Sequence, residues 1–224
     1  MTRIWIGFTP YIVVSIVHVV ALMLGAEAVA APTKLLLMPC LAAGALWAAR
    51  GTGRTPDITL LIVAIVLSWL GDGAGTFFPW GPTVPLMLLW FGLAHLVYIW
   101  LFWRRLALRP LPAWTLVYAL WWGALLAVLW PHLGGLAIAV AAYGLVLGGT
   151  AAAAARCHPL VLWGGVFFLT SDSVLAFRLF LPEAMPGWTS PLVMLTYTLG
   201  QGLIAAGVVA TVRRRISARA ELTR

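Results

Sequence analysis

Charged residues are scarce in this sequence. Asp, Glu, Lys and Arg make up 9% of its 224 residues, hydrophobic residues make up 63%, and the mean hydropathy is +1.02. Soluble globular domains carry about 25% charged residues, so this composition excludes a soluble domain. The apolar runs are continuous, whereas the strands of a membrane β-barrel alternate lipid-facing and lumen-facing residues. We therefore expect an all-α integral membrane protein.

Signatures of metal sites and of activated nucleophiles are also missing. The sequence has no HExxH or GxSxG motif, and its two cysteines and four histidines fit no ligand spacing. The glycine-rich segment "GDGAG" at 71–75 does not follow a strand and so is no phosphate loop. Its glycines predict close helix packing or a loosened helix end. We expect no metal and no cofactor.

Apolar runs long enough to cross a bilayer are, by contrast, abundant. A spanning helix needs about 20 apolar residues, and charge, Pro and Gly divide the chain into eight such runs. We place the spans at residues 4–25, 33–49, 58–77, 86–103, 113–130, 134–154, 159–180 and 191–212. Because the connections are short, residues 1–224 are expected to form a single transmembrane domain. The first run is too long for a usual signal peptide, so we expect a retained first helix.

The basic residues are distributed by loop. They fall at the N-terminus and at every second boundary between spans, at Arg3, Arg50, Arg54, Arg104, Arg105, Arg109, Arg156, Arg213, Arg214, Arg215, Arg219 and Arg224. Arginine marks the cytoplasmic side, so both termini are expected inside, in a multi-pass protein of a bacterial plasma membrane. The net charge of +8 then indicates topology and contact with membrane lipids, and no nucleic-acid binding.

A weak internal repeat relates the two halves of the chain. The spans that begin at 58 and 86 are followed, at nearly the same offset, by those that begin at 159 and 191. Asp72 and Asp172 occupy corresponding positions. Two parallel four-helix pseudo-repeats, related by an axis along the membrane normal, would place these aspartates opposite each other at similar depth.

The two intramembrane aspartates are the main candidates for function. An Asp at the centre of a span costs about 2.5–3.5 kcal/mol and is by default a functional-site candidate. The alternative is structural: Asp72 could bond to Ser68, one turn earlier, and Asp172 could bond to Ser171 or Ser173. The presence of a pair, with polar residues at similar depth, favours function.

Those polar residues share helix faces. His95 and Tyr98 are spaced i and i+3, and Tyr197 and Gln201 are spaced i and i+4. The candidates for positioning substrate or water are His95, Tyr98, Tyr197, Gln201, Ser68 and Ser171. Lys34 and Arg178, near the outer helix ends, are candidates for binding phosphate, or else charges that extend to the interface.

Several segments together make the chain resemble the lysoplasmalogenase family, also called YhhN-like membrane hydrolases. In the family's order, they are "KLLLMP" (34–39), "GD" (71–72), "AHLVY" (94–98), "SDSVLA" (171–176) and "LVMLTYTLGQGLIA" (192–205). Small residues follow Asp72 where the family tends to be bulkier, and Thr198 stands where a second Tyr is common. These departures bear on substrate fit more than on reaction type.

The resemblance implies hydrolysis of the vinyl ether bond of a lysoplasmalogen, a lysophospholipid, to a fatty aldehyde and glycerophospho-ethanolamine or -choline. Two neighbouring carboxylates in a low dielectric do not both ionise readily. Asp72 and Asp172 would therefore be the catalytic pair, one a general acid and the other a base. We favour Asp172 as the acid, because Ser68 could help to hold Asp72 ionised.

Two other classes of function fit the same residues. A proton-coupled transporter or a lipid-binding protein could use the paired aspartates, and a parallel repeat suits a carrier. A scaffold that only packs against partners would tolerate Asn at both positions. A hydrolase differs from both because it releases aldehyde in detergent without any gradient.

Overall fold

The computed structural model describes residues 2–222, and all their regular elements are helices, which confirms the all-α prediction. The long helices are α1 (Thr2–Met23), α2 (Glu27–Ala48), α3 (Pro56–Asp72), α5 (Thr83–Trp100), α6 (Val117–Leu129), α7 (Ala137–Ala154), α8 (Pro159–Phe180) and α9 (Thr189–Leu222). The short ones are α4 (Ala74–Phe77), the π-helical η1 (Leu101–Leu106), and the 3-10 turns η2 (Ala113–Leu116), η3 (Trp130–His132), η4 (Gly134–Leu136) and η5 (Pro182–Ala184). Arg224, one of the basic residues used for topology, lies outside the described residues.

The helices have the lengths of membrane spans. Among residues 2–222, seven are long and apolar enough to cross a bilayer, which makes the chain an integral multi-pass membrane protein. The remaining predicted span, 58–77, is divided into α3 and α4 at Gly73. At 17 residues, α3 is at the lower limit for a spanning helix. The loosened helix end predicted from "GDGAG" is confirmed.

The helix boundaries that differ most from the prediction, apart from the break at Gly73, are the start of α2 and the end of α9. α2 begins at Glu27 rather than at 33, because Pro32 lies inside its early turns instead of preceding them; membrane helices accept such prolines. α9 continues to Leu222 rather than ending at 212. Its last turns are rich in Arg and Ala, which are strong helix formers, so the helix persists past the apolar run.

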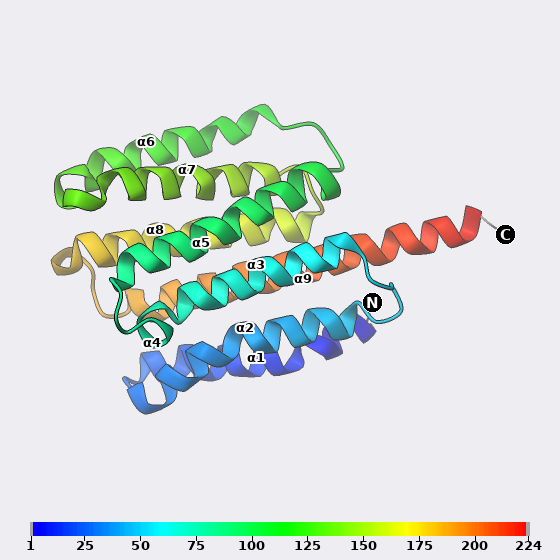
Figure 1. Cartoon of the computed structure of the whole chain (residues 1–224), viewed down its shortest axis with the longest axis horizontal. Coiled ribbons are helices and arrows are strands. Elements are labelled where there is room, and N and C mark those ends of the chain that lie inside the picture. Colours follow the sequence, from blue (N-terminus) through cyan, green and yellow to red (C-terminus); the bar gives the residue numbers. More distant parts are fainter. Residues whose placement is uncertain (1, 223–224) are drawn as a thin grey trace.

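α9 is the central helix of the bundle. In Figure 1, α6 and α7 lie along one side and α1 and α2 along the other, with α3, α5, α8 and α9 between them. α9 contacts α1, α2, α3 and α8. In its most apolar stretch 67% of the residues are buried, against 17% for the stretch that contains α6. Most of the α9 surface is therefore shielded from lipid.

The helix pairs of the two halves correspond. α1 packs on α2 and α3 on α5 in the first half, as α6 packs on α7 and α8 on α9 in the second. This is the pairing that two parallel four-helix repeats require. The axis that would relate them stays a prediction.

Arginine side chains join the helices at the end of the bundle where α1 begins and α9 ends (Figure 1). The Asp57 carboxylate, in the first turn of α3, pairs with Arg105 and lies 3.7 Å from Arg215 Nη1. Arg213 Nη1 donates a hydrogen bond of 2.7 Å to the Ala48 carbonyl. The predicted gathering of arginine at one end is present, and its assignment to the cytoplasm stays a prediction.

α8 and α9 approach so closely that their backbones touch. A Cβ atom at Gly164 would lie 2.8 Å from the Gly200 carbonyl oxygen, and one at Gly200 would lie 2.9 Å from the Phe168 nitrogen. Neither position accepts a side chain without a shift of backbone. This contact fixes the register between the Asp172 helix and the helix that carries Tyr197 and Gln201.

We expect Gly200→Ala to lower the free energy of unfolding by about 1–3 kcal/mol, the usual cost of overpacking a tight contact. Gly123→Ala is the matched control, because a Cβ on that residue of α6 would meet nothing within 4 Å. Ala there should add about 0.5–1 kcal/mol through helix propensity. Unfolding of both variants in detergent, followed by circular dichroism, measures the difference. Equal stability of the two variants would contradict the close α8–α9 contact.

Candidate active site

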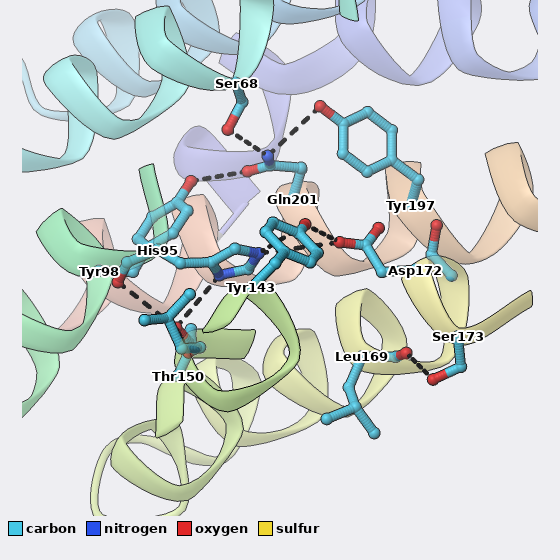
Figure 2. Close-up of polar contacts among 12 residues, drawn as sticks. Ser68, His95, Tyr98, Tyr143, Thr150, Leu169, Asp172, Ser173, Tyr197 and Gln201 are labelled. Atoms are coloured by element: carbon cyan, nitrogen blue, oxygen red, sulfur yellow. Dashed lines mark hydrogen bonds and ion pairs between the residues drawn. The ribbon is translucent and has the colours of Figure 1, made fainter. Parts of the chain in front are cut away.

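The side-chain amide of Gln201 connects three helices inside the bundle (Figure 2). Tyr98 on α5 donates to Gln201 Oε1 at 2.6 Å, and Gln201 Nε2 donates to Ser68 Oγ on α3 at 3.0 Å. The same nitrogen lies 3.5 Å from the Tyr197 hydroxyl, one turn earlier on α9. Gln201, Tyr98 and Ser68 are all fully buried. The structure thus brings four predicted site residues into one hydrogen-bonded cluster.

Asp72 lies at the edge of this cluster. It is the last residue of α3, and Tyr197 donates a hydrogen bond of 2.7 Å to its Oδ2. The negative end of a helix dipole disfavours a carboxylate at this position. Lys34 on α2 lies close enough to interact electrostatically with Asp72 and offsets that effect. The bond between Ser68 and Asp72 that the structural alternative requires is not among the described contacts, and Ser68 Oγ accepts from Gln201 instead.

Asp172 belongs to a second cluster, formed by α5, α7 and α8 (Figure 2). Tyr143 on α7 donates a hydrogen bond to Asp172 Oδ2, and His95 Nε2 lies 3.8 Å from the same oxygen. The His95 side chain is completely buried, and that of Asp172 is 8% exposed. His95 Nδ1 lies 3.1 Å from Thr150 Oγ1. Asp172 also interacts electrostatically with Asp72, so the two carboxylates act within one region.

Both ring nitrogens of His95 face a hydroxyl oxygen that can accept a hydrogen bond. Thr150 Oγ1 lies 3.1 Å from Nδ1 and donates its own hydrogen to the Val146 carbonyl at 2.9 Å. The Tyr143 hydroxyl, which donates to Asp172, lies 3.4 Å from Nε2. A proton on either His95 or Asp172 makes the contact between the two attractive. The arrangement therefore suits a pair that holds one transferable proton.

Sequence reasoning missed two members of this cluster. Tyr143 and Thr150 are the only hydroxyl-bearing residues of α7, an otherwise apolar helix. They are spaced i and i+7, which places them on one helix face two turns apart. This spacing is a sequence signal that could have identified them.

The serines next to Asp172 contact backbone instead of the carboxylate. Ser171 Oγ donates to the Val193 carbonyl on α9 at 3.0 Å, and Ser173 Oγ donates to the Leu169 carbonyl at 2.6 Å. Among the described residues, neither serine bonds to Asp172. The structural alternative, in which these serines satisfy the aspartate, therefore loses its support.

A narrow apolar cavity adjoins Asp172. Asp172 and Tyr143 line it together with side chains of α5, α6, α7 and α8, namely Met87, Leu88, Phe91, Leu125, Val140, Gly144, Leu147, Leu175, Ala176, Leu179 and Phe180. We call this the apolar cavity. Its volume is about 40 Å³, so its walls suit a short segment of a hydrocarbon chain with one end at the Asp172 carboxyl.

A second cavity, of about 370 Å³, contains the two predicted phosphate-binding residues. Lys34 and Arg178 both line this cationic cavity, which lies between α1, α2, α8 and α9. Arg178 Nη1 donates to Thr189 Oγ1, whereas Lys34 has no hydrogen-bond or ion-pair partner among residues 2–222. Leu175 and Leu179 line the apolar and the cationic cavity alike.

Within the described chain, no three His, Cys, Asp or Glu side chains gather in a way that could hold a metal ion.

Comparison with known proteins gives one result. The model of the YhhN family matches residues 29–208, a range that contains both aspartates, both clusters and Lys34. Comparisons with curated proteins and with solved structures gave no match.

We expect Gln201→Leu to destabilise the bundle strongly, because it leaves the hydroxyls of Tyr98 and Ser68 buried without their partner. Each unsatisfied buried group costs about 1–3 kcal/mol. Thr170→Val is the control: Thr170 is exposed and bonds only within its own helix, to the Val166 carbonyl, so its loss should stay within about 0.5 kcal/mol. Thermal unfolding in detergent compares the two. Similar midpoints for both variants would show that the Gln201 cluster contributes little.

Proposed function

The chain belongs to the YhhN family, and from this premise we propose that it is an intramembrane hydrolase that cleaves the vinyl ether bond of lysoplasmalogens. Membership of the family indicates a membrane hydrolase-like function. The proposal of vinyl ether cleavage rests on the observation that the two carboxylates have different surroundings. Asp172 is coupled to His95 and borders the apolar cavity, while Asp72 bonds to Tyr197 near Lys34.

The first step of the proposed reaction transfers a proton to carbon. The proton held by Asp172 and His95 moves to the alkene carbon that is not bonded to oxygen. The electron pair of the double bond forms the new C–H bond, and the ether oxygen stabilises the positive charge as an oxocarbenium ion. The hydrogen bond from Tyr143 to Asp172 orients the donor. The apolar cavity would place the alkenyl group beside it.

The second step adds water to the cation. Asp72 accepts a proton from a water molecule whose oxygen bonds to the oxocarbenium carbon, and a hemiacetal forms. The hemiacetal then gives its hydroxyl proton to Asp172, which lost a proton in the first step, as the bond to the glycerol oxygen breaks. The glycerol oxygen takes the proton that Asp72 accepted from water, so both aspartates return to their starting states. The products are an aldehyde and an alcohol, and the sum is the addition of one water molecule. Glycosidases handle a similar cation with two carboxylates.

The surroundings of each aspartate support Asp172 as the acid and Asp72 as the base. Burial of the Asp72 carboxyl favours its protonated form, and the positive charge of Lys34 and the Tyr197 hydroxyl act against this in favour of the ionised form that a base needs. They fill the role that the sequence assigned to Ser68. His95 Nε2 lies 3.8 Å from Asp172 Oδ2, and this neighbouring imidazole suits a carboxyl that gives up and regains a proton as a general acid.

The two cavities suit the two parts of a lysophospholipid. Lys34 and Arg178 would bind the phosphate in the cationic cavity by charge-assisted hydrogen bonds. The alkenyl chain would enter the apolar cavity and continue toward the lipid. Of the remaining predicted residues, Gln201, Tyr98 and Ser68 would hold Tyr197 and α3 in place, and Ser171 would hold α8 against α9.

We expect purified wild-type protein in detergent with EDTA to release aldehyde from an alkenyl-lysophosphoethanolamine. Asp72→Asn and Asp172→Asn should each lower kcat/KM by about 10²–10⁴-fold, the usual contribution of a general acid or base. Circular dichroism establishes that both variants fold. If folded wild type releases no aldehyde from any lysoplasmalogen, the proposal is wrong. Proton-driven accumulation of substrate in sealed vesicles would then indicate a transporter.

We expect Tyr143→Phe to lower kcat by about 10-fold or more, because the variant removes a hydrogen bond that orients the proton donor. Tyr118→Phe is the matched control, since Tyr118 on α6 lines neither described cavity and packs against Trp114. Steady-state aldehyde release measures both. An equal effect of the two substitutions would contradict the role assigned to Tyr143.

A further inference from the structure

His18 on α1 is a buried histidine with only one of its two nitrogens satisfied. The residue is 2% exposed, and its Nδ1 lies 2.9 Å from Thr33 Oγ1. Its Nε2 has no partner among the described residues. A buried polar atom without a partner is costly, and a hydrogen bond from a ligand would remove this cost. His18 lies outside residues 29–208, the part of the chain that the family model matches.

Thr33 determines which nitrogen of His18 carries hydrogen. The Thr33 hydroxyl donates its single hydrogen to the Val29 carbonyl at 2.6 Å, so it can only accept from His18 Nδ1. A neutral His18 therefore has its hydrogen on Nδ1 and a lone pair on Nε2. The free nitrogen can accept a hydrogen bond from a ligand and cannot donate one.

His18 lines the cationic cavity together with Lys34, Arg178 and Glu27. The cavity thus combines two cations, which suit a phosphate, with two acceptors, which suit an N–H donor. Among the described residues that line it there is no Trp, Tyr or Phe. Quaternary ammonium groups have no N–H and are bound mainly by such aromatic faces. The lining therefore favours a primary ammonium over a choline group.

Lys34 interacts electrostatically with His18 and also with Asp72, so it lies within reach of both. A lysophospholipid carries its phosphate between the glycerol that bears the ether and the terminal ammonium. A phosphate at Lys34 would therefore leave the ether within reach of Asp72 and the ammonium within reach of His18. Leu175 and Leu179 line this cavity and the apolar cavity, which favours a lipid over a water-soluble phosphoethanolamine.

We propose that the cationic cavity binds the phosphoethanolamine head group of a lysophospholipid and selects it over phosphocholine, with His18 Nε2 accepting a hydrogen bond from the ammonium. This inference rests on the proposed hydrolase function and adds the head group to it. Lys34 and Arg178 bind the phosphate. Glu27, exposed at the rim, adds a weaker attraction for the ammonium.

The test compares kcat/KM for alkenyl-lysophosphoethanolamine and alkenyl-lysophosphocholine. Wild type should prefer ethanolamine by about tenfold, the value of one hydrogen bond to a charged group. His18→Asn places an amide near the Nδ1 position, so it can keep the Thr33 contact but lacks the outer acceptor, and its preference should fall to about one. His18→Gln places an amide oxygen near the Nε2 position and should retain part of the preference.

Ser15→Ala is the control on the same helix. Ser15 bonds only to the Tyr11 carbonyl and does not line the cationic cavity, so the ethanolamine preference should persist. Equal rates of wild type on both head groups, or an unchanged preference in His18→Asn, would overturn the inference while leaving the hydrolase proposal intact.

A binding measurement separates failure of this inference from failure of the hydrolase proposal. Saturated ether analogues of the two lysolipids lack the vinyl group, so their effect on thermal unfolding does not depend on hydrolysis. The ethanolamine analogue should raise the Tm of wild type more than the choline analogue, and His18→Asn should remove the difference. Equal shifts in wild type overturn the inference. Stabilisation by water-soluble phosphoethanolamine at the same concentrations would overturn the assignment of the site to a lipid.

Discussion

The hydrogen bonds of the Gln201 amide are the interaction on which the rest of this structure depends. Inside a bilayer a buried amide must find its partners within the protein, and Gln201 finds them on α3 and α5. Tyr197 lies one turn before Gln201 and reaches Asp72, while His95 lies one turn before Tyr98 and reaches Asp172. One amide therefore sets the positions of both carboxylate clusters, although it touches neither aspartate.

The two aspartates are chemically different because their neighbours differ. Each accepts a hydrogen bond from a tyrosine, Asp72 from α9 and Asp172 from α7. Beyond that similarity, Asp72 has a cation within electrostatic reach, whereas Asp172 faces a histidine whose other nitrogen is fixed by a threonine. Surroundings of this kind divide acid and base roles between identical side chains.

The sequence predicted the helices well, because the length of an apolar run and the thickness of a bilayer determine a span almost independently of tertiary contacts. It also predicted that His95 and Tyr98, and Tyr197 and Gln201, share helix faces, since this spacing is a property of a single helix. The sequence did not predict the hydrogen bonds that hydroxyl groups form with residues on other helices. Ser68 sits one turn from Asp72 and yet binds Gln201 on α9. Contacts between helices depend on packing that the local pattern does not contain.

The wall shared by the two cavities has a consequence for any attempt to redesign this protein. Leu175 and Leu179 project from α8 into positions where each borders both the apolar and the cationic cavity. A larger or smaller side chain at either position alters two compartments in one step. A substitution at Leu175 or Leu179 therefore changes selectivity for the hydrocarbon chain and for the polar group together. Leu125 borders only the apolar cavity and Ser190 only the cationic cavity, so a substitution at either residue acts on one of the two described cavities.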